Sequence, residues 1–114
     1  MAQPAVARFF PERAVPPIYI AILTYVRPLE EIDRHVEAHI EWLRRHYEDG
    51  TFLLSGRRVP RTGGVIVTRG ESREAVEALL KTDPFQQHGV ATVEIIPMQV
   101  AMAADGLKDV FLAP

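Results

Sequence analysis

His39 and Asp83 are the two residues of this 114-residue sequence whose chemistry best suits proton transfer. A histidine between the core and water exchanges a proton with a ligand near neutral pH. A carboxylate bound to such a ring would orient it and stabilise its charged form. Each residue also has a structural interpretation: His39 as a hydrogen-bonded residue at the core edge, and Asp83 before Pro84 as a helix N-cap. The sequence alone does not show that the two side chains meet.

A second group of residues, near the middle of the chain, has the chemistry to bind a small molecule. Ser55 is a poor nucleophile candidate because the Gly-x-Ser-x-Gly elbow is absent, but its hydroxyl can hydrogen-bond a substrate. Gly56 allows a tight turn or the close approach of a ligand to the backbone. Arg57, Arg58 and Arg61 carry the charge that binds a substrate carboxylate, although a solvated run of charge is the commoner explanation.

Other kinds of site are excluded by composition and spacing. The sequence has no cysteine, which excludes disulfides, thiolate zinc sites, iron–sulfur clusters and cysteine nucleophiles. His35 and His39 have the i, i+4 spacing of a metal-binding pair, but no glutamate directly follows the first histidine as a zinc-protease helix requires. We therefore expect no metal and no other cofactor.

The charge balance also restricts the partners. Thirteen Lys and Arg residues against fifteen Asp and Glu residues give a net charge of −2, so there is no broad basic surface for nucleic acid. No apolar run approaches the roughly 20 residues that span a bilayer. The first residues lack the cationic and apolar regions of a secretory signal. We expect a cytoplasmic protein that binds neither nucleic acid nor a membrane.

The elements that must position these residues follow from the hydrophobic pattern. Residues 18–26 are mostly β-branched or aromatic and apolar on both alternating faces, which predicts a strand buried on both sides. Steps of three and four then predict one long helix that Gly50 ends, with His39 near the edge of its apolar stripe. The apolar residues of that stripe are Leu29, Ile32, Val36, Ile40, Leu43 and Tyr47.

Three more strands and a second helix complete the pattern. Residues 52–56 and 63–68 predict short strands, and residues 90–98 predict a fourth. Gly63 and Gly64 lead into a strand rather than a helix, so they do not form a phosphate loop. Ser72 is a good N-cap for a helix to about residue 81. The residues of this helix expected to face inward are Ala75, Val76, Leu79 and Leu80.

The order strand–helix–strand–strand–helix–strand is that of the ferredoxin-like α+β fold. Such a βαββαβ unit makes a four-stranded antiparallel sheet with both helices on one face. We expect it to occupy residues 18–98. Four prolines in residues 1–17 predict an extended arm, and residues 99–114 form a tail whose structure the pattern does not predict.

Two helices cover only one face of such a sheet, and the other face keeps large apolar side chains. On the first strand, Ile18, Ile20 and Ile22 alternate with a second apolar set. A wet patch of this kind exceeds what monomers usually expose. At about 25 cal/mol per Å², burying several hundred Å² favours association by many kcal/mol before the costs of binding. We expect a homodimer whose sheets stack face to face.

Several segments, taken in order, resemble the YciI-like, or YCII-related, family. The pattern begins with His-Ile-Glu-Trp-Leu at 39–43 and continues through the glycine turn and strand at 49–56. It then includes Asp-Pro-Phe at 83–85 and the strand residues 93–97. The resemblance covers about residues 18–98 and implies a ferredoxin-like fold that dimerises through its sheets as a dimeric α+β barrel.

The resemblance also implies a chemistry. One branch of the family is similar to dehydrochlorinases that remove HCl from chlorinated hydroxyhydroquinones, and the wider superfamily includes muconolactone isomerases. Both reactions are proton transfers that a His–Asp pair carries without a cofactor. We expect a lyase or isomerase acting on a small cyclic or aromatic acid, with His39 as general base or acid and Asp83 as its orienting partner. The residues expected to bind the substrate are Ser55, Gly56, Arg57 and Phe85.

Two alternatives stay open at this point. One is a dimeric module that binds a small molecule without catalysis, and the other is a cofactor-free oxygenase on the same fold. The proline-rich arm and the tail depart from the simplest family members and could reshape the pocket. The substrate class therefore does not carry over from the family.

Overall fold

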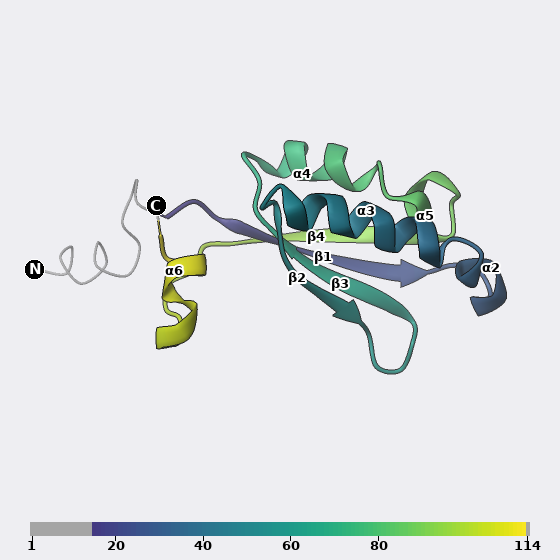
Figure 1. Ribbon diagram of the computed structural model, residues 1–114, viewed down its shortest axis with the longest axis horizontal. Coiled ribbons are helices and arrows are strands. Elements are labelled where there is room, and N and C mark those ends of the chain that lie inside the picture. Colours follow the sequence, from purple (N-terminus) through teal and green to yellow (C-terminus); the bar gives the residue numbers. More distant parts are fainter. Residues whose placement is uncertain (1–14, 114) are drawn as a thin grey trace, which may run out of the picture.

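A four-stranded antiparallel sheet with helices on one face organises residues 15–113, the part of the chain that the computed structural model describes (Figure 1). Strands β1 (Ile18–Tyr25), β2 (Phe52–Arg57), β3 (Gly63–Thr68) and β4 (Ala91–Met98) lie in the order β2-β3-β1-β4. Helices α2 (Leu29–Asp33) and α3 (Val36–Glu48) connect β1 to β2, and α4 (Arg73–Leu80) and α5 (Pro84–Gln87) connect β3 to β4. The predicted ferredoxin-like α+β fold is confirmed.

Strand alternation separates a helix-facing side of the sheet from an open side. Ala21 on β1 lies opposite Ile66 on β3 and Ile95 on β4, and all three are buried under the helices. Ile20 and Ile22 take the other parity and are only half-buried. The prediction that this strand is buried on both sides is therefore only partly met within one chain, because the helices cover one face of the sheet. The core on the helix-facing side also includes Leu23, Ile32, Trp42, Phe52, Val76, Leu80, Phe85 and Val90.

The prediction of one long helix that begins at about residue 29 and is ended by Gly50 is wrong, because α2 and α3 are separate. The backbone N–H groups of Arg34 and His35 bond carbonyls only three residues back, and His35 has ψ near 0°. This tighter turn changes the helix direction. Ile32 on α2 and Trp42 on α3 are both fully buried.

The buried face of α3 also differs from the predicted stripe. Ile40 and Tyr47 are 40% and 39% exposed, whereas Trp42 is 1% exposed. His39 and His46 are half-buried on the same side as Trp42. Trp42 is held inward by its indole N–H, which donates to the Thr82 hydroxyl at 2.8 Å. Val36 and Leu43 of the predicted stripe do pack against the core. Trp42 with the two histidines completes the inward face in place of Ile40 and Tyr47.

Both predicted N-caps are present at the second helical connection. The Ser72 hydroxyl accepts the Ala75 amide at 3.0 Å at the start of α4. Val76 and Leu80 are buried as expected, but Ala75 is exposed because it lies on the outer side of the first turn. Asp83 caps the short helix α5, whose first residue is Pro84.

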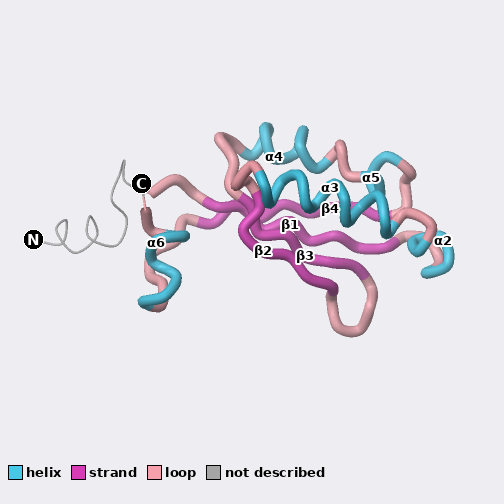
Figure 2. Tube along the Cα trace, in the orientation of Figure 1, coloured by secondary structure: helices cyan, strands magenta, loops and turns pink. Residues whose placement is uncertain are grey.

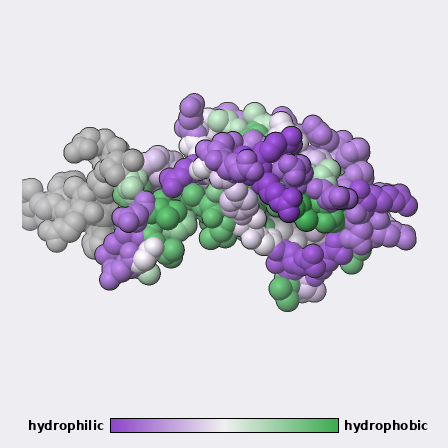
Figure 3. Space-filling model, viewed as in Figure 1, coloured by the Kyte–Doolittle hydropathy of each residue, from purple (hydrophilic) through white to green (hydrophobic). Residues whose placement is uncertain are grey.

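The tail folds against one end of the open side of the sheet. It forms a 3₁₀ turn, η1 (Asp105–Leu107), and a short helix, α6 (Lys108–Phe111), on the side opposite α3 and α4 (Figure 2). Phe111 and Met102 line an apolar groove with Ile18 and Leu54, and hydrophobic residues gather between α6 and the sheet (Figure 3). The predicted arm falls mostly outside the described residues. In residues 15–113, no helix is both long and apolar enough to cross a bilayer.

Candidate functional site

His39 on α3 and Asp83 at the start of α5 meet beneath the packed helices. The Nδ1 atom of His39 lies 2.7 Å from Oδ1 of Asp83, although 44 positions separate the residues in the chain. The Asp83 side chain is fully buried and that of His39 is 15% exposed. An ionised carboxylate can only accept a hydrogen bond, so Nδ1 is the donor in this contact, and Nε2 is the nitrogen that carries the lone pair in the neutral ring.

The N-cap fixes the Asp83 carboxylate in the position that His39 needs. Its Oδ1 atom also accepts the amide hydrogen of Phe85 at 3.0 Å. Its Oδ2 atom is buried without a hydrogen-bond partner among the described residues. A buried carboxylate with one unpaired oxygen is compensated when its neighbour becomes positive. The site therefore suits a ring that takes up a proton during a reaction.

Aromatic packing fixes the plane of the imidazole. Phe85 stacks on His39 with ring centroids 4.0 Å apart and an interplanar angle of 11°. Phe85 in turn contacts Tyr25 in an edge-to-face arrangement, with ring centroids 5.9 Å apart and an interplanar angle of 85°. Stacking of this kind excludes water from one face of His39 and limits its rotation.

A cavity of about 190 Å³ opens beside His39, between α3 and the sheet. For scale, an apolar cavity of about 150 Å³ can bind benzene. This cavity therefore has room for one substituted ring. Its apolar lining comes from Leu23, Val36, Ile40, Leu43, Val65, Ile66 and Phe85, and its polar side chains from Tyr25, His39, Ser55, Arg57 and Arg61.

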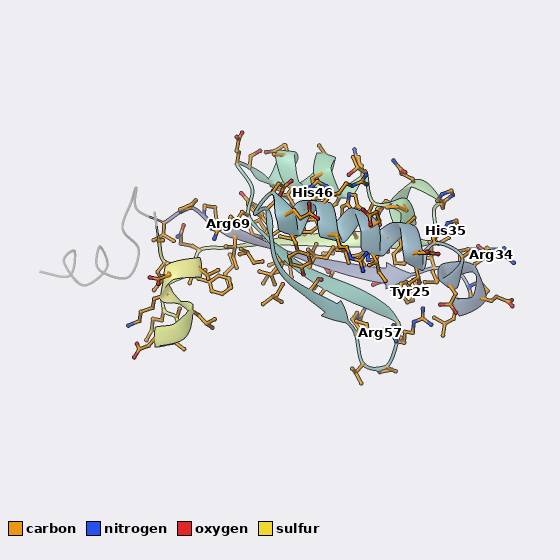
Figure 4. The ribbon with its side chains drawn as sticks, in the orientation of Figure 1. Tyr25, Arg34, His35, His46, Arg57 and Arg69 are labelled. Carbon is orange, nitrogen blue, oxygen red and sulfur yellow. The ribbon has the colours of Figure 1, made fainter. Side chains whose placement is uncertain are left out.

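The four residues that the sequence suggested for binding all line this cavity, in different ways. The Ser55 hydroxyl lies 2.6 Å from the Tyr47 hydroxyl. Gly56 pairs with Val65, which puts its Cα hydrogens on the open side, so only its backbone faces the cavity. Arg57 ends β2 where the hairpin leaves the sheet (Figure 4). Phe85 is buried beside His39 as described above.

Comparison with known families identifies the chain. The YCII-related domain matches residues 18–99. The chain belongs to the YCII-related family. Comparison with curated protein sequences finds no match.

Solved structures share the fold of this YCII-related protein, and one of them is named for the reaction it catalyses. It is the 5-chloro-2-hydroxyhydroquinone dehydrochlorinase of Burkholderia phenoliruptrix AC1100, in complex with 2,5-dihydroxybenzoquinone. The TM-score is 0.60 and the identity 18%, over 69% of this chain and 90% of that chain. At this identity the likeness shows the fold alone.

Not all predicted chemistry-bearing residues of this YCII-related protein reach the cavity. Arg58 points elsewhere and donates to the Thr24 hydroxyl at 3.0 Å. His35 stacks on His88 with centroids 4.0 Å apart. Within residues 15–113 no group of three or more His, Cys, Asp or Glu side chains is placed to hold a metal ion.

Two tyrosines of the site were missed in the sequence. Tyr25 lines the cavity, and its alternation with Leu23 on the first strand was the signal that could have placed it there. Tyr47 was assigned to an apolar stripe, but its hydroxyl contacts Ser55. No pattern in the sequence predicts that contact, because it depends on how α3 packs on β2.

Proposed function

We propose that this YCII-related protein is a cofactor-free lyase or isomerase that transfers a proton on a small cyclic or aromatic acid. The observation that carries the proposal is the 2.7 Å contact between His39 and Asp83 beside a cavity of ring size. A base, its orienting partner and a space for the reacting atom are the parts that general acid–base catalysis requires.

In this mechanism His39 Nε2 takes a proton from a carbon or hydroxyl next to a carbonyl of the bound ring. Asp83 stabilises the imidazolium that forms. In an isomerisation the same nitrogen returns the proton to another carbon. In an elimination from the keto tautomer of a chlorinated hydroxyhydroquinone, in which the carbon that carries chlorine is tetrahedral, the electron pair of the broken O–H bond forms a carbonyl, the ring double bond shifts toward that carbon and chloride leaves with its own pair. The imidazolium then gives its proton to water. The Ser55 hydroxyl, next to Tyr47, would hydrogen-bond a ring oxygen.

The fold neighbour supports this direction. That protein is a dehydrochlorinase bound to a dihydroxylated benzoquinone, a planar ring that a cavity of about 190 Å³ would hold. We carry over the class of reaction as a hypothesis and leave the individual substrate open.

The test is turnover by the wild-type protein and by His39→Gln. We would follow chloride release from 5-chloro-2-hydroxyhydroquinone and deuterium uptake by lactone and cyclic keto-acid probes in D₂O. His39→Gln should lower the rate by about 10²–10⁴ while the circular dichroism spectrum stays unchanged. Equal turnover by the variant would reject His39 as the proton-transfer residue.

The same assays separate the alternatives. A protein that binds these probes but turns none of them over is a binding module. Oxygen consumption that accompanies turnover identifies an oxygenase. Either result would replace the lyase or isomerase assignment.

We also propose that two copies pair through the open sides of their sheets. Leu54 is 51% exposed there, and Ile96 and Met98 are each 40% exposed. The tail covers only one end of this side, where Phe111 and Met102 reach the sheet. A second copy would bury the remaining apolar side chains.

A further inference from the structure

The charged side chains that line the cavity directly are arginines. The protein has a net charge of −2. Two arginines, Arg57 and Arg61, line the cavity, and no aspartate or glutamate lines it directly; the carboxylates of Asp33 and Asp83 are bonded to Arg61 and His39. Cationic groups in a concave, largely apolar site concentrate anions of small size. The cavity is therefore built for a ligand that carries negative charge.

Arg61 is held in place although it comes from the loop between β2 and β3. Its Nη2 atom donates to the Asp33 carboxylate, and its Cζ atom lies 6.0 Å from the centroid of the Tyr25 ring. The hydrogen bond to Asp33, with a smaller contribution from Tyr25, raises the pKa of the Arg61 guanidinium above its ordinary value. The guanidinium is thus permanently charged and restrained from two sides.

Arg61 retains hydrogen-bonding capacity that the protein does not use. A guanidinium has five N–H donors, and the side-chain hydrogen bonds of Arg61 within the described residues go to Asp33. Its Nε–H group is buried and has no partner in that part of the chain. Buried donors without acceptors are rare in folded proteins. An acceptor atom from a bound molecule would supply what is missing.

Arg57 provides a second positive charge at the cavity and, unlike Arg61, has no carboxylate partner among the described residues. It lies on the lining of the same cavity, at the end of β2, and forms no ion pair with any of residues 15–113. By contrast, Arg58, the next residue, is bonded to Thr24 and lies outside the lining. Arg57 and Arg61 therefore line the cavity, whereas Arg58 does not.

We propose that Arg61, together with Arg57, selects substrates that carry an anionic oxygen on a single planar ring, either a carboxylate or a ring oxyanion. This inference rests on the proposed function, because it assigns the substrate class of that same cavity. Arg61 binds the oxygen through its restrained guanidinium, and Arg57 adds a mobile charge. The apolar lining contacts the faces of the ring, and His39 meets the atom that exchanges its proton.

The test is binding, measured apart from turnover. Titration calorimetry, with the fluorescence of the single tryptophan, Trp42, as a second readout, compares 4-hydroxybenzoate and 2,5-dihydroxybenzoquinone with neutral 4-hydroxybenzamide. Arg61→Gln and Arg57→Gln should each weaken binding of the anionic probes by about tenfold or more. Neither substitution should change binding of the neutral amide. Arg58→Gln is the matched control and should bind all probes like the wild type.

Three results would overturn the inference: no binding of either anion by the wild type, equal affinity for anionic and neutral probes, or unchanged anion affinity in both Arg57→Gln and Arg61→Gln. Melting temperatures of the variants check that each is folded, and Arg61→Lys tests whether charge alone restores binding. His39→Gln distinguishes this proposal from the proposed function. Turnover by that variant with intact charge selection rejects only the catalytic role of His39.

Discussion

The Nδ1 atom of His39 and the Oδ1 atom of Asp83 lie 2.7 Å apart, and the same Oδ1 atom caps helix α5 through the Phe85 amide. One oxygen thus satisfies both interpretations of Asp83, the structural and the chemical. They do not compete, because the cap is what holds the carboxylate against the imidazole. The start of α5 thereby positions the carboxylate beside the ring that we propose transfers a proton.

This double role predicts different results for two substitutions of Asp83. Asparagine is as good an N-cap as aspartate, so Asp83→Asn should fold normally and lower turnover by about 10²–10⁴ because the imidazolium loses its counter-charge. Asp83→Ala should lose turnover and also stability, by about 1–2 kcal/mol from the cap. Initial rates and urea denaturation measure both. Full turnover by Asp83→Asn would show that Asp83 acts only as a helix N-cap and not as the partner of His39 in catalysis.

The hydrogen bond between Trp42 and Thr82 predicts a stability effect outside the cavity. Trp42 is buried, and its indole N–H donates to the Thr82 hydroxyl at 2.8 Å. Thr82→Ala should lower the free energy of unfolding by about 1–3 kcal/mol, because a buried donor is left unsatisfied. Thr82→Ser keeps the hydroxyl and should be close to wild type. If both variants unfold at the same urea concentration as the wild type, this bond does not contribute.

The strands and the starts of α4 and α5 could be predicted because they depend on local pattern. The alternation along β1 separates Ala21 and Leu23 from Ile20 and Ile22 whatever the rest of the chain does. A Ser or Asp N-cap likewise needs only its own following turn, as at Ser72. These features fixed the order of elements and therefore the sheet.

The details of the site depended on tertiary packing. Helix α3 begins after His35 and packs with His39 and Trp42 on its inward side. The spacing of the aliphatic residues does not show where this helix begins. Arg61 reaches the cavity because Asp33, from α2, bonds it across the structure. Contacts between a loop and a distant helix leave no periodic signal in the sequence.

The two glycines that begin β3 predict a local steric effect. A Cβ atom at Gly63 would overlap the backbone carbonyl of Leu23, which cannot move without breaking the β1–β3 ladder. Gly63→Ala should therefore destabilise the fold by about 1–3 kcal/mol or more. At Gly56, on neighbouring β2, nothing lies within 4 Å of an added Cβ. Gly56→Ala is the matched control, and equal melting temperatures for the two variants would contradict the prediction.

The open side of the sheet predicts how the protein assembles. Leu54 is half-exposed on β2 and belongs to the apolar groove of that side, while Leu29, similarly exposed at 43%, lies on α2 away from the sheet. Burying a charge in a sheet-to-sheet interface is costly, so Leu54→Glu should shift a wild-type dimer to monomer in light scattering. Leu29→Glu places the same charge on a surface outside the proposed interface and should remain dimeric. If the wild-type protein has the mass of a monomer from micromolar to millimolar concentration, the proposed pairing is wrong. The open side of the sheet would then be covered only by the tail and by solvent.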